Sequence, residues 1–421
     1  PLSGDTKKLN VFGWASTNPL FGGTGSGSSD ASSAVGILAS LANAGYETNA
    51  DLTQMYVDYR ADRPTIAMAV QDWTLPELTA NFYTDGVMAA TKEFSDTAVI
   101  VIGRSGGEGA DLPTDMNAVI KGTWNIGETM IHSENSNYGY TNGTYTNNGS
   151  YDDFDAGESY LELSNTEEDM IKTVCDAFDK VIVIINANNT MELGWVDEYP
   201  SIGAVLLAPG AGKTGFNALG EIINGSVNPS GRTVDTFVKD LTATPTFNNF
   251  GHHGYTNVDD LRQTIAAADT YEGALGFVNY VEGIYVGYKY YETASDEGVI
   301  TFEDEVQYPF GYGLSYTTFE QKMDLADNGD TVTVNVTVTN TGSVAGKDVV
   351  ELYVTPPYTN GGIEKASVNL VDFAKTASLE PGASETVTFE VAKESLASYD
   401  SNGIKVSGNG GYILEAGEYV M

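Results

Sequence analysis

Short runs of consecutive apolar residues recur along the first half of the chain, at residues 9–14, 97–103, 181–187 and 204–209. Between them, apolar positions recur every three or four residues, as in amphipathic helices. The segments with this helical spacing or composition are residues 31–44, 51–60, 86–94, 166–178 and 214–224. Buried strands without polar alternation, separated by helices, indicate a parallel sheet covered on both faces. The pattern therefore predicts an α/β fold, with Thr166 as the N-cap of the helix that follows it.

The pattern changes near residue 317. Residues 331–339 alternate between apolar and polar side chains with a period of two, and residues 348–354 and 385–391 also have strand character. Turn-forming residues separate these segments, which is typical of a small antiparallel sandwich of ~100 residues. We therefore predict an α/β domain at residues 1–316 and an all-β domain at residues 317–421.

A long segment between residues 104 and 165 shows little periodicity and is rich in Gly, Asn, Asp, Ser and Tyr. Loops of this length in compact domains are usually functional or mobile. The segment is therefore the first place to search for a site.

Composition narrows the classes of function. The chain has 421 residues and a formal net charge of −38. Such acidity, without a basic patch, argues against binding to nucleic acid or anionic lipid. Cys175 is the only cysteine, so internal disulfides and cysteine-cluster zinc sites are excluded. Three histidines leave little material for a metal site, and no apolar run approaches the ~20 residues of a membrane span. We expect neither a metal nor a cofactor.

Two glycine-rich segments only partly resemble phosphate-binding loops. Residues 209–214 (PGAGKT) follow a predicted strand, but Leu207 stands where a P-loop needs glycine. Residues 23–27 (GTGSG) follow the first strand, but Ser28 takes the place of the third glycine of a dinucleotide fingerprint. A turn and a flexible loop are the simpler interpretations, and a nucleotide-dependent enzyme stays an alternative.

Two other pairs of residues have simple structural interpretations. His252 and His253 are adjacent, so on an extended strand they point to opposite faces and seldom share one metal ion. Asp72 precedes Trp73 without a β-branched strand before it, which favours a surface loop over a catalytic aspartate.

The segment at residues 103–111 (GRSGGEGAD) is the strongest candidate for chemistry. It lies at the carboxyl end of the predicted strand 97–103, where open α/β sheets bind ligands. Glu108 stands between two glycines, so the backbone beside it can approach a substrate closely. A glutamate acts as a general acid if apolar surroundings or a second carboxylate raise its pKa toward neutrality.

The order of motifs resembles glycoside hydrolase family 3. The motifs are TAVIVIGRSGGEGAD, LSNTEEDMIKTVCDAF, NPSGRTVDTF, EGIYVGYKYYET and YPFGYGLSYTTFE. The resemblance covers nearly the whole chain, and it implies a β-glucosidase-like enzyme. Family members combine a TIM-type barrel, an α/β sandwich and a fibronectin-III-like domain. This chain looks like the last two, at residues 1–316 and 317–421.

The resemblance implies that the barrel is missing from this chain, so we expect it in cis or as a separate subunit. A large exposed apolar face on the sandwich is the expected docking surface for it. The implied substrate is a β-linked oligosaccharide or glycoside. An extracellular or cell-surface location in a bacterial-type protein is favoured, because polymer-trimming glycosidases are often exported.

The resemblance also implies a mechanism. Family members hydrolyse β-glycosides with retention, using two carboxyl groups ~5–5.5 Å apart. The nucleophilic Asp belongs to the barrel, and the acid/base is the Glu of a Gly-Glu-Gly-x-Asp segment, which matches Glu108. Leu112 replaces an arginine common in the family, so the contacts of Asp111 and Arg104 stay open. Four other glutamates on the long segment remain rivals for the acid/base role: Glu128, Glu134, Glu158 and Glu162.

A non-catalytic carbohydrate-binding or structural module is the main alternative. The chain has 25 tyrosines, many of them in residues 138–160 and 280–316, and aromatic faces stack on sugar rings. Under the enzyme hypothesis, the isolated chain should lack turnover, because a single general acid forms no glycosyl-enzyme intermediate.

Overall fold

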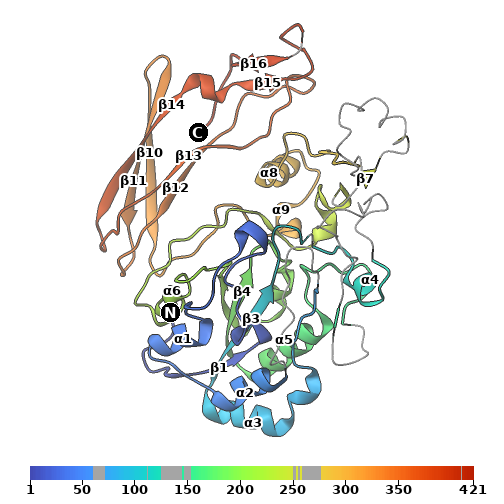
Figure 1. Cartoon of the computed structure of the whole chain (residues 1–421). Helices are drawn as coiled ribbons and strands as arrows, with labels where there is room; N and C mark the ends of the chain where they lie inside the picture. The colour runs from blue at the N-terminus through green and yellow to red at the C-terminus, as the bar shows by residue number, and fades with distance from the viewer. Residues whose placement is uncertain are drawn as a thin grey trace. The chain divides into compact units, whose positions relative to one another are not determined.

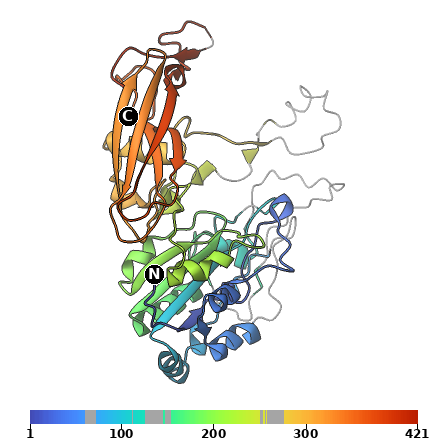
Figure 2. The same cartoon turned by 90° about the vertical axis from the view of Figure 1, so that its left-hand side faces the viewer.

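The computed structural model describes residues 1–59, 72–110, 112–124, 145–146, 153–249, 253–254, 257, 276–408 and 410–421 (Figures 1 and 2). The chain forms two compact units. The first contains Pro1–Asn224 and Asp240–Tyr280, and the second contains Gly225–Lys239 and Val281–Met421. The domain boundary between residues 316 and 317 stays a prediction.

A parallel sheet with strand order β2-β1-β3-β4-β5 forms the centre of the first unit. Its strands are β1 (Lys8–Phe12), β2 (Glu47–Thr48), β3 (Thr97–Arg104), β4 (Lys180–Ala187) and β5 (Ile202–Leu207). The predicted α/β fold is confirmed. The sequence did not predict β2, because two residues are too short to show a period.

Helices lie between these strands along the chain, and one more follows the last strand. They are α1 (Ile37–Asn43), α2 (Ala50–Tyr59), α3 (Asp85–Phe94), α4 (Met116–Ile120), α5 (Asn165–Ala177) and α6 (Asn217–Asn224). Helices α1 and α6 lie on one side of the sheet and α5 on the other (Figure 1). Gly220 lets α6 approach α1 closely, because a Cβ there would lie 2.4 Å from the carbonyl oxygen of Ser40.

Two predicted helix starts are wrong. Helix α1 begins at Ile37 rather than residue 31, because Gly36 is extended at the N-cap position. The N-cap of α5 is Ser164 and not Thr166. Ser164 and Glu167 form a reciprocal capping box, which satisfies two backbone donors at once. Thr166 instead donates its hydroxyl to Asp153 at 2.6 Å.

Strands β3 and β4 are buried along almost their whole length, as their apolar sequences predict. Strand β5 is different, because its residues are half-buried or exposed. It pairs only with β4 within the described sheet, so it lies at the edge. The strand predicted at residues 204–209 is therefore present as β5, but the prediction that it is buried is wrong.

Antiparallel strands dominate the second unit. One sheet contains β10 (Phe319–Asp327), β11 (Thr331–Asn340) and β14 (Ser384–Ala392), and another contains β12 (Val349–Val354) and β13 (Asn369–Lys375). Val334, Val338, Leu352 and Phe389 belong to the shared core. This agrees with the alternation in the sequence. Near the end of the chain, Thr355 and Val420 form an isolated antiparallel bridge.

The remaining elements are short. They are β6 (Phe237–Val238), β7 (His253–Gly254), β8 (Gly276–Phe277), α8 (Tyr288–Asp296), α9 (Phe302–Glu305), β9 (Val306–Tyr308), β15 (Ser398–Asp400) and β16 (Gly411–Ile413). Within the described ranges, no helix is long and apolar enough to cross a membrane.

Candidate active site

The order in which the chain adds strands to the sheet reverses between β1 and β3, and the candidate site lies at the carboxyl ends of these two strands. The two strands are neighbours, but the chain runs from β1 toward β2 and from β3 toward β4. Crossovers that leave in opposite directions open a crevice between their loops, and open α/β sheets bind ligands there. Glu108 lies on the loop after β3, so the structure places the candidate at this switch point.

Two hydrogen bonds from Thr24 join the loop after β1 to the loop after β3. Thr24 donates its backbone N–H to the carbonyl oxygen of Gly106 at 3.1 Å and its hydroxyl to that of Glu108 at 2.6 Å. A Cβ on Gly107 would lie 2.3 Å from the nitrogen of Thr24, and Gly107 has a φ of 139°. Only glycine fits at this contact, which explains the glycine-rich sequence on the β3 loop.

The carboxylate of Glu108 is exposed and turned toward the loop after β1. Its Oε2 accepts hydrogen bonds from the backbone N–H and the hydroxyl of Ser26, both at 2.7 Å. These bonds stabilise the charged form, so they lower the pKa of Glu108. A general acid needs the opposite shift, and the apolar surroundings that would raise the pKa are not present around this side chain in the described part of the chain.

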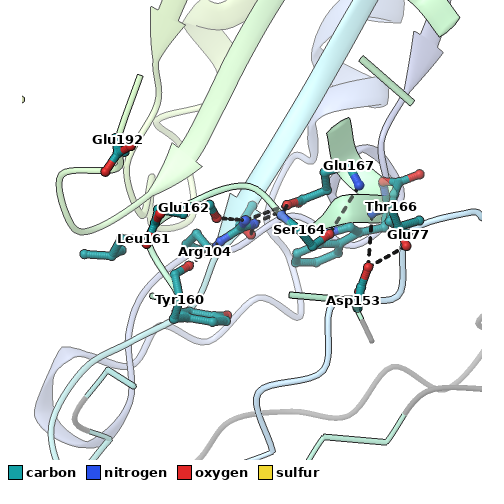
Figure 3. A network of polar contacts seen from close by, with 12 residues as sticks. Glu77, Arg104, Asp153, Tyr160, Leu161, Glu162, Ser164, Thr166, Glu167 and Glu192 are labelled. Carbon is teal, nitrogen blue, oxygen red and sulfur yellow. Dashed lines mark hydrogen bonds and ion pairs between the residues drawn. The ribbon is translucent and has the colours of Figure 1, made fainter. Parts of the chain in front are cut away.

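A buried ion pair supports the base of the β3 loop (Figure 3). Arg104 ends β3 and binds Glu167 through two hydrogen bonds, at 2.8 and 2.5 Å, with both side chains fully buried. It also donates to the carbonyl oxygens of Tyr160 at 2.6 Å and Glu162 at 2.6 Å. Burial alone would lower the pKa of Arg104, but the charge of Glu167 and its hydrogen bonds raise it. Arg104 is therefore buried, and its guanidinium group binds partners inside the fold.

A second buried carboxyl group, that of Glu77, supports the loop after β1. Glu77 accepts hydrogen bonds from the backbone N–H of Trp14 and of Leu78, both at 2.9 Å, and from the hydroxyl of Tyr83 at 3.2 Å. Burial raises the pKa of Glu77 to about 8. This role could not be predicted from the sequence, because Glu77 and Trp14 are 63 positions apart.

Trp73 does not lie on a surface loop. Its side chain is fully buried, and its ring centroid lies 4.8 Å from that of Tyr160 in an edge-on contact. The hydroxyl of Tyr160 accepts a hydrogen bond from the backbone N–H of Ser105 at 3.2 Å. The surface-loop interpretation of Asp72-Trp73 is therefore wrong, and Trp73 helps to build the support beneath residues 105–110.

Two rivals of Glu108 are bound to their own loop. Glu158 accepts from the backbone N–H of Asp155, and Glu162 accepts from that of Ser159, each at 2.5 Å. Burial raises the pKa of both glutamates. Glu192, which the sequence did not single out, accepts from a backbone N–H at 2.9 Å, and burial raises its pKa to about 7.

Several sequence candidates lie outside the described residues: Asp111, Glu128, Glu134, His132 and His252. His253 is described, and its backbone pairs with Phe277.

The P-loop-like segment is bound to the loop after β1. Lys213 forms an ion pair with Asp30 at 2.8 Å, and this contact together with hydrogen bonds from Ser32 lowers the pKa of Asp30 to about 2. Gly210 donates its backbone N–H to the side chain of Asn188 at 2.6 Å. The lysine that would meet a phosphate is already paired with a carboxylate.

Comparison with known proteins gives consistent results along the chain. Residues 1–288 match the glycosyl hydrolase family 3 C-terminal domain, and residues 348–421 match a fibronectin type III-like domain. The chain is 31% identical over 416 residues to a β-glucosidase of Ruminococcus albus, covering 98% of the chain and 36% of that protein. It is 32% identical over 386 residues to β-glucosidase A of Butyrivibrio fibrisolvens, covering 87% and 39%.

The similar solved structures are also β-glucosidases. β-Glucosidase 3B of Thermotoga neapolitana, in complex with glucose, has a TM-score of 0.71 at 31% identity, covering 100% of this chain and 48% of that one. A β-glucosidase of Paenibacillus barengoltzii has a TM-score of 0.72 at 29% identity, covering 98% and 38%. The chain thus spans a little over a third of the length of the two curated relatives, at 36% and 39%.

The parallel sheet of the first unit and the antiparallel sheets of the second agree with these two domain matches. The chain belongs to the glycosyl hydrolase family 3, whose C-terminal domain it matches over residues 1–288.

Proposed function

We propose that this chain is the α/β sandwich and fibronectin-III-like portion of a retaining, exo-acting β-glycosidase, and that Glu108 is its general acid/base. In this proposal, the sandwich covers residues 1–316 and the fibronectin-like domain residues 317–421. The nucleophilic aspartate lies on a TIM-type barrel, in cis or as a separate chain. The observation that carries the proposal is the position of Glu108, exposed at the topological switch point of the sheet.

The reaction needs two carboxyl groups in two steps. In the first, the barrel aspartate attacks the anomeric carbon, the glycosidic C–O bond breaks, and protonated Glu108 gives its proton to the departing oxygen. In the second, ionised Glu108 takes a proton from water as the water oxygen attacks the anomeric carbon and releases the aspartate.

In this chain without a barrel, the lowered pKa of Glu108 suits its role as the base in the second step but not its role as the acid in the first. An ionised carboxylate is ready to act as the base, but a general acid must hold a proton near neutral pH. A second carboxylate ~5–5.5 Å away raises the pKa of its partner, and so does the exclusion of water. The proposal therefore requires that the barrel and the substrate raise the pKa of Glu108.

Glu158 and Glu162 differ from Glu108 in their exposure, and this difference supports the choice of Glu108. Glu158 and Glu162 have raised pKa values, but both are half-buried, and each accepts a hydrogen bond from the backbone of its own loop. Glu108 is the one of these three that is exposed on the loop after β3.

The first experiment is hydrolysis of 4-nitrophenyl β-glucoside and β-xyloside by the purified 421-residue chain, with Glu108→Gln beside it. We expect no turnover from either protein, because the nucleophile is on the barrel. Turnover that disappears in Glu108→Gln would place the second catalytic carboxylate within this chain and overturn the domain assignment.

The second experiment uses the complete enzyme, in which this chain acts with its barrel. We expect Glu108→Gln to lower kcat by roughly 10²–10⁴-fold, the usual contribution of a general acid. A change in sugar binding without a loss of kcat would favour the carbohydrate-binding module instead.

A further inference from the structure

Ser26 makes an asymmetric contact with the candidate acid/base. Its backbone N–H and its hydroxyl both donate to the same oxygen of Glu108, Oε2, and both distances are 2.7 Å. Within the part of the chain that the structure describes, Oε1 accepts no hydrogen bond. The two oxygens of one carboxylate are thus in different environments.

Two features of the loop fix this contact. Gly25 has a φ of 59°, and a Cβ on it would lie 2.4 Å from Oε2 of Glu108, so the carboxylate rests directly against the glycine backbone. Thr24 holds the backbone of Glu108 from the same loop, through a hydroxyl bond of 2.6 Å to its carbonyl oxygen. Thr24 and Gly25, the two residues before Ser26, therefore also contact Glu108.

We propose that Ser26 is a positioning residue that fixes Oε2 of Glu108 and leaves Oε1 as the oxygen that gives and takes the catalytic proton. This inference rests on the proposed role of Glu108 as the acid/base, and it deepens that role.

Hydrogen-bond chemistry gives the reason. In a neutral carboxyl group, the carbonyl oxygen accepts hydrogen bonds and the hydroxyl oxygen carries the proton. A proton on Oε2 would face the backbone N–H of Ser26, which can only donate, so the neutral form carries its proton on Oε1 and keeps both hydrogen bonds from Ser26 to Oε2. In the first step, the Oε1–H bond breaks and the proton moves to the departing glycosidic oxygen. In the second, Oε1 takes a proton from the attacking water, and Oε2 keeps both bonds throughout.

Two pairs of charged groups that the structure describes near these loops bind each other. Asp30 lies on the loop after β1 and binds Lys213 from the loop after β5 at 2.8 Å. Arg104 and Glu167 lie beneath the β3 loop and bind each other at 2.5 Å. Ser26 therefore supplies the largest effects on the ionisation of Glu108, since its two hydrogen bonds are the main causes of the lowered pKa.

The first test measures the pKa of Glu108 directly in the 421-residue chain. The side-chain carboxyl carbons of glutamate are labelled with ¹³C, and the resonance that disappears in Glu108→Gln is followed through a pH titration. We expect Ser26→Ala to raise the pKa of Glu108, because one of two donors to the charged form is lost. Ser26→Thr keeps the hydroxyl and should stay close to the wild type. Ser28→Ala is the matched control on the same loop and should change nothing.

The second test measures kcat and KM against pH in the complete enzyme. The basic limb of kcat/KM reports the group that must be protonated in the free enzyme. We expect Ser26→Ala to move this limb to higher pH and to lower kcat by roughly tenfold, a part of the 10²–10⁴-fold that a general acid supplies, with KM little changed. Ser26→Thr should restore both.

The outcomes separate the two proposals. An unchanged pKa of Glu108 and an unchanged basic limb in Ser26→Ala, with Glu108→Gln still inactive, overturn the positioning role and leave the proposed function intact. Full activity of Glu108→Gln overturns the proposed function, and with it the proton transfer through Oε1, even if Ser26→Ala shifts the titration.

Discussion

Replacing Arg104 tests whether the buried ion pair beneath the β3 loop holds the first unit together. Arg104→Met keeps a long apolar side chain but removes five hydrogen bonds: two to Glu167, and one each to the carbonyl oxygens of Gly103, Tyr160 and Glu162. The carboxylate of Glu167 would then be buried with its charge unpaired. Breaking a buried pair in this way costs about 3–5 kcal/mol, a large part of the ~5–15 kcal/mol that stabilises a domain.

Urea unfolding monitored by tryptophan fluorescence is the suitable assay. All four tryptophans, Trp14, Trp73, Trp124 and Trp195, lie in the first unit, so the signal reports that unit alone. With an m-value of about 2–3 kcal/mol/M, the midpoint should fall by roughly 1–2.5 M.

An exposed ion pair provides the matched control. Lys172 and Asp176 lie 2.7 Å apart on α5, and their side chains are 66% and 65% exposed. Lys172→Met should cost only about 0.3–0.5 kcal/mol. The double variant Arg104→Met/Glu167→Gln should be less destabilised than Arg104→Met alone, because it leaves no unpaired charge. A loss in Arg104→Met as small as in Lys172→Met would refute the reasoning.

Three further predictions concern the supports of the two loops. Burial raises the pKa of Glu77 from 4.5 to about 8, so the folded protein keeps a proton that the unfolded chain has lost, and the free energy of unfolding should fall as the pH rises through this window. Glu77→Gln should remove up to about 1.4 kcal/mol of this decrease per pH unit, measured by urea unfolding at pH 5 and 8; an unchanged slope would contradict it. Gly107→Ala places a Cβ 2.3 Å from the nitrogen of Thr24, so we expect faster hydrogen exchange at Thr24 than in the wild type, and equal exchange would be evidence against the close contact. Ser164→Ala removes the N-cap of α5 and should cost about 1 kcal/mol in urea unfolding, whereas no loss would argue against the capping box.

The strands of the first unit were predictable because their apolar runs are long and bounded by helices. Strands β3 and β4 lie where the runs at residues 97–103 and 181–187 indicated them. The exposure of β5 was not predictable, because sequence cannot tell which strand of a parallel sheet lies at its edge. The capping box of α5 was missed because Thr166 has the side chain of a good N-cap, although it is used to bind Asp153.

The candidate site was only partly predictable. The strand before Glu108 and the glycines around it gave its position in the fold. Its partner Ser26 could not be inferred, because the two residues are 82 positions apart and meet only through the order of strands in the sheet. The direction of the pKa shift was missed for the same reason, since it depends on donors supplied by another loop.

The proton donated by Glu108 is the central claim, and the dependence of kcat/KM on the leaving group tests it most directly. In the complete enzyme, the Glu108→Gln variant is compared on an alkyl β-glucoside and on 2,4-dinitrophenyl β-glucoside, with Glu158→Gln and Glu162→Gln as matched controls. Dinitrophenolate leaves without a proton, so we predict a loss of roughly 10²–10⁴-fold on the alkyl glucoside and a far smaller loss on the dinitrophenyl glucoside. Equal losses on both substrates, or this pattern in Glu158→Gln or Glu162→Gln instead, would contradict the assignment.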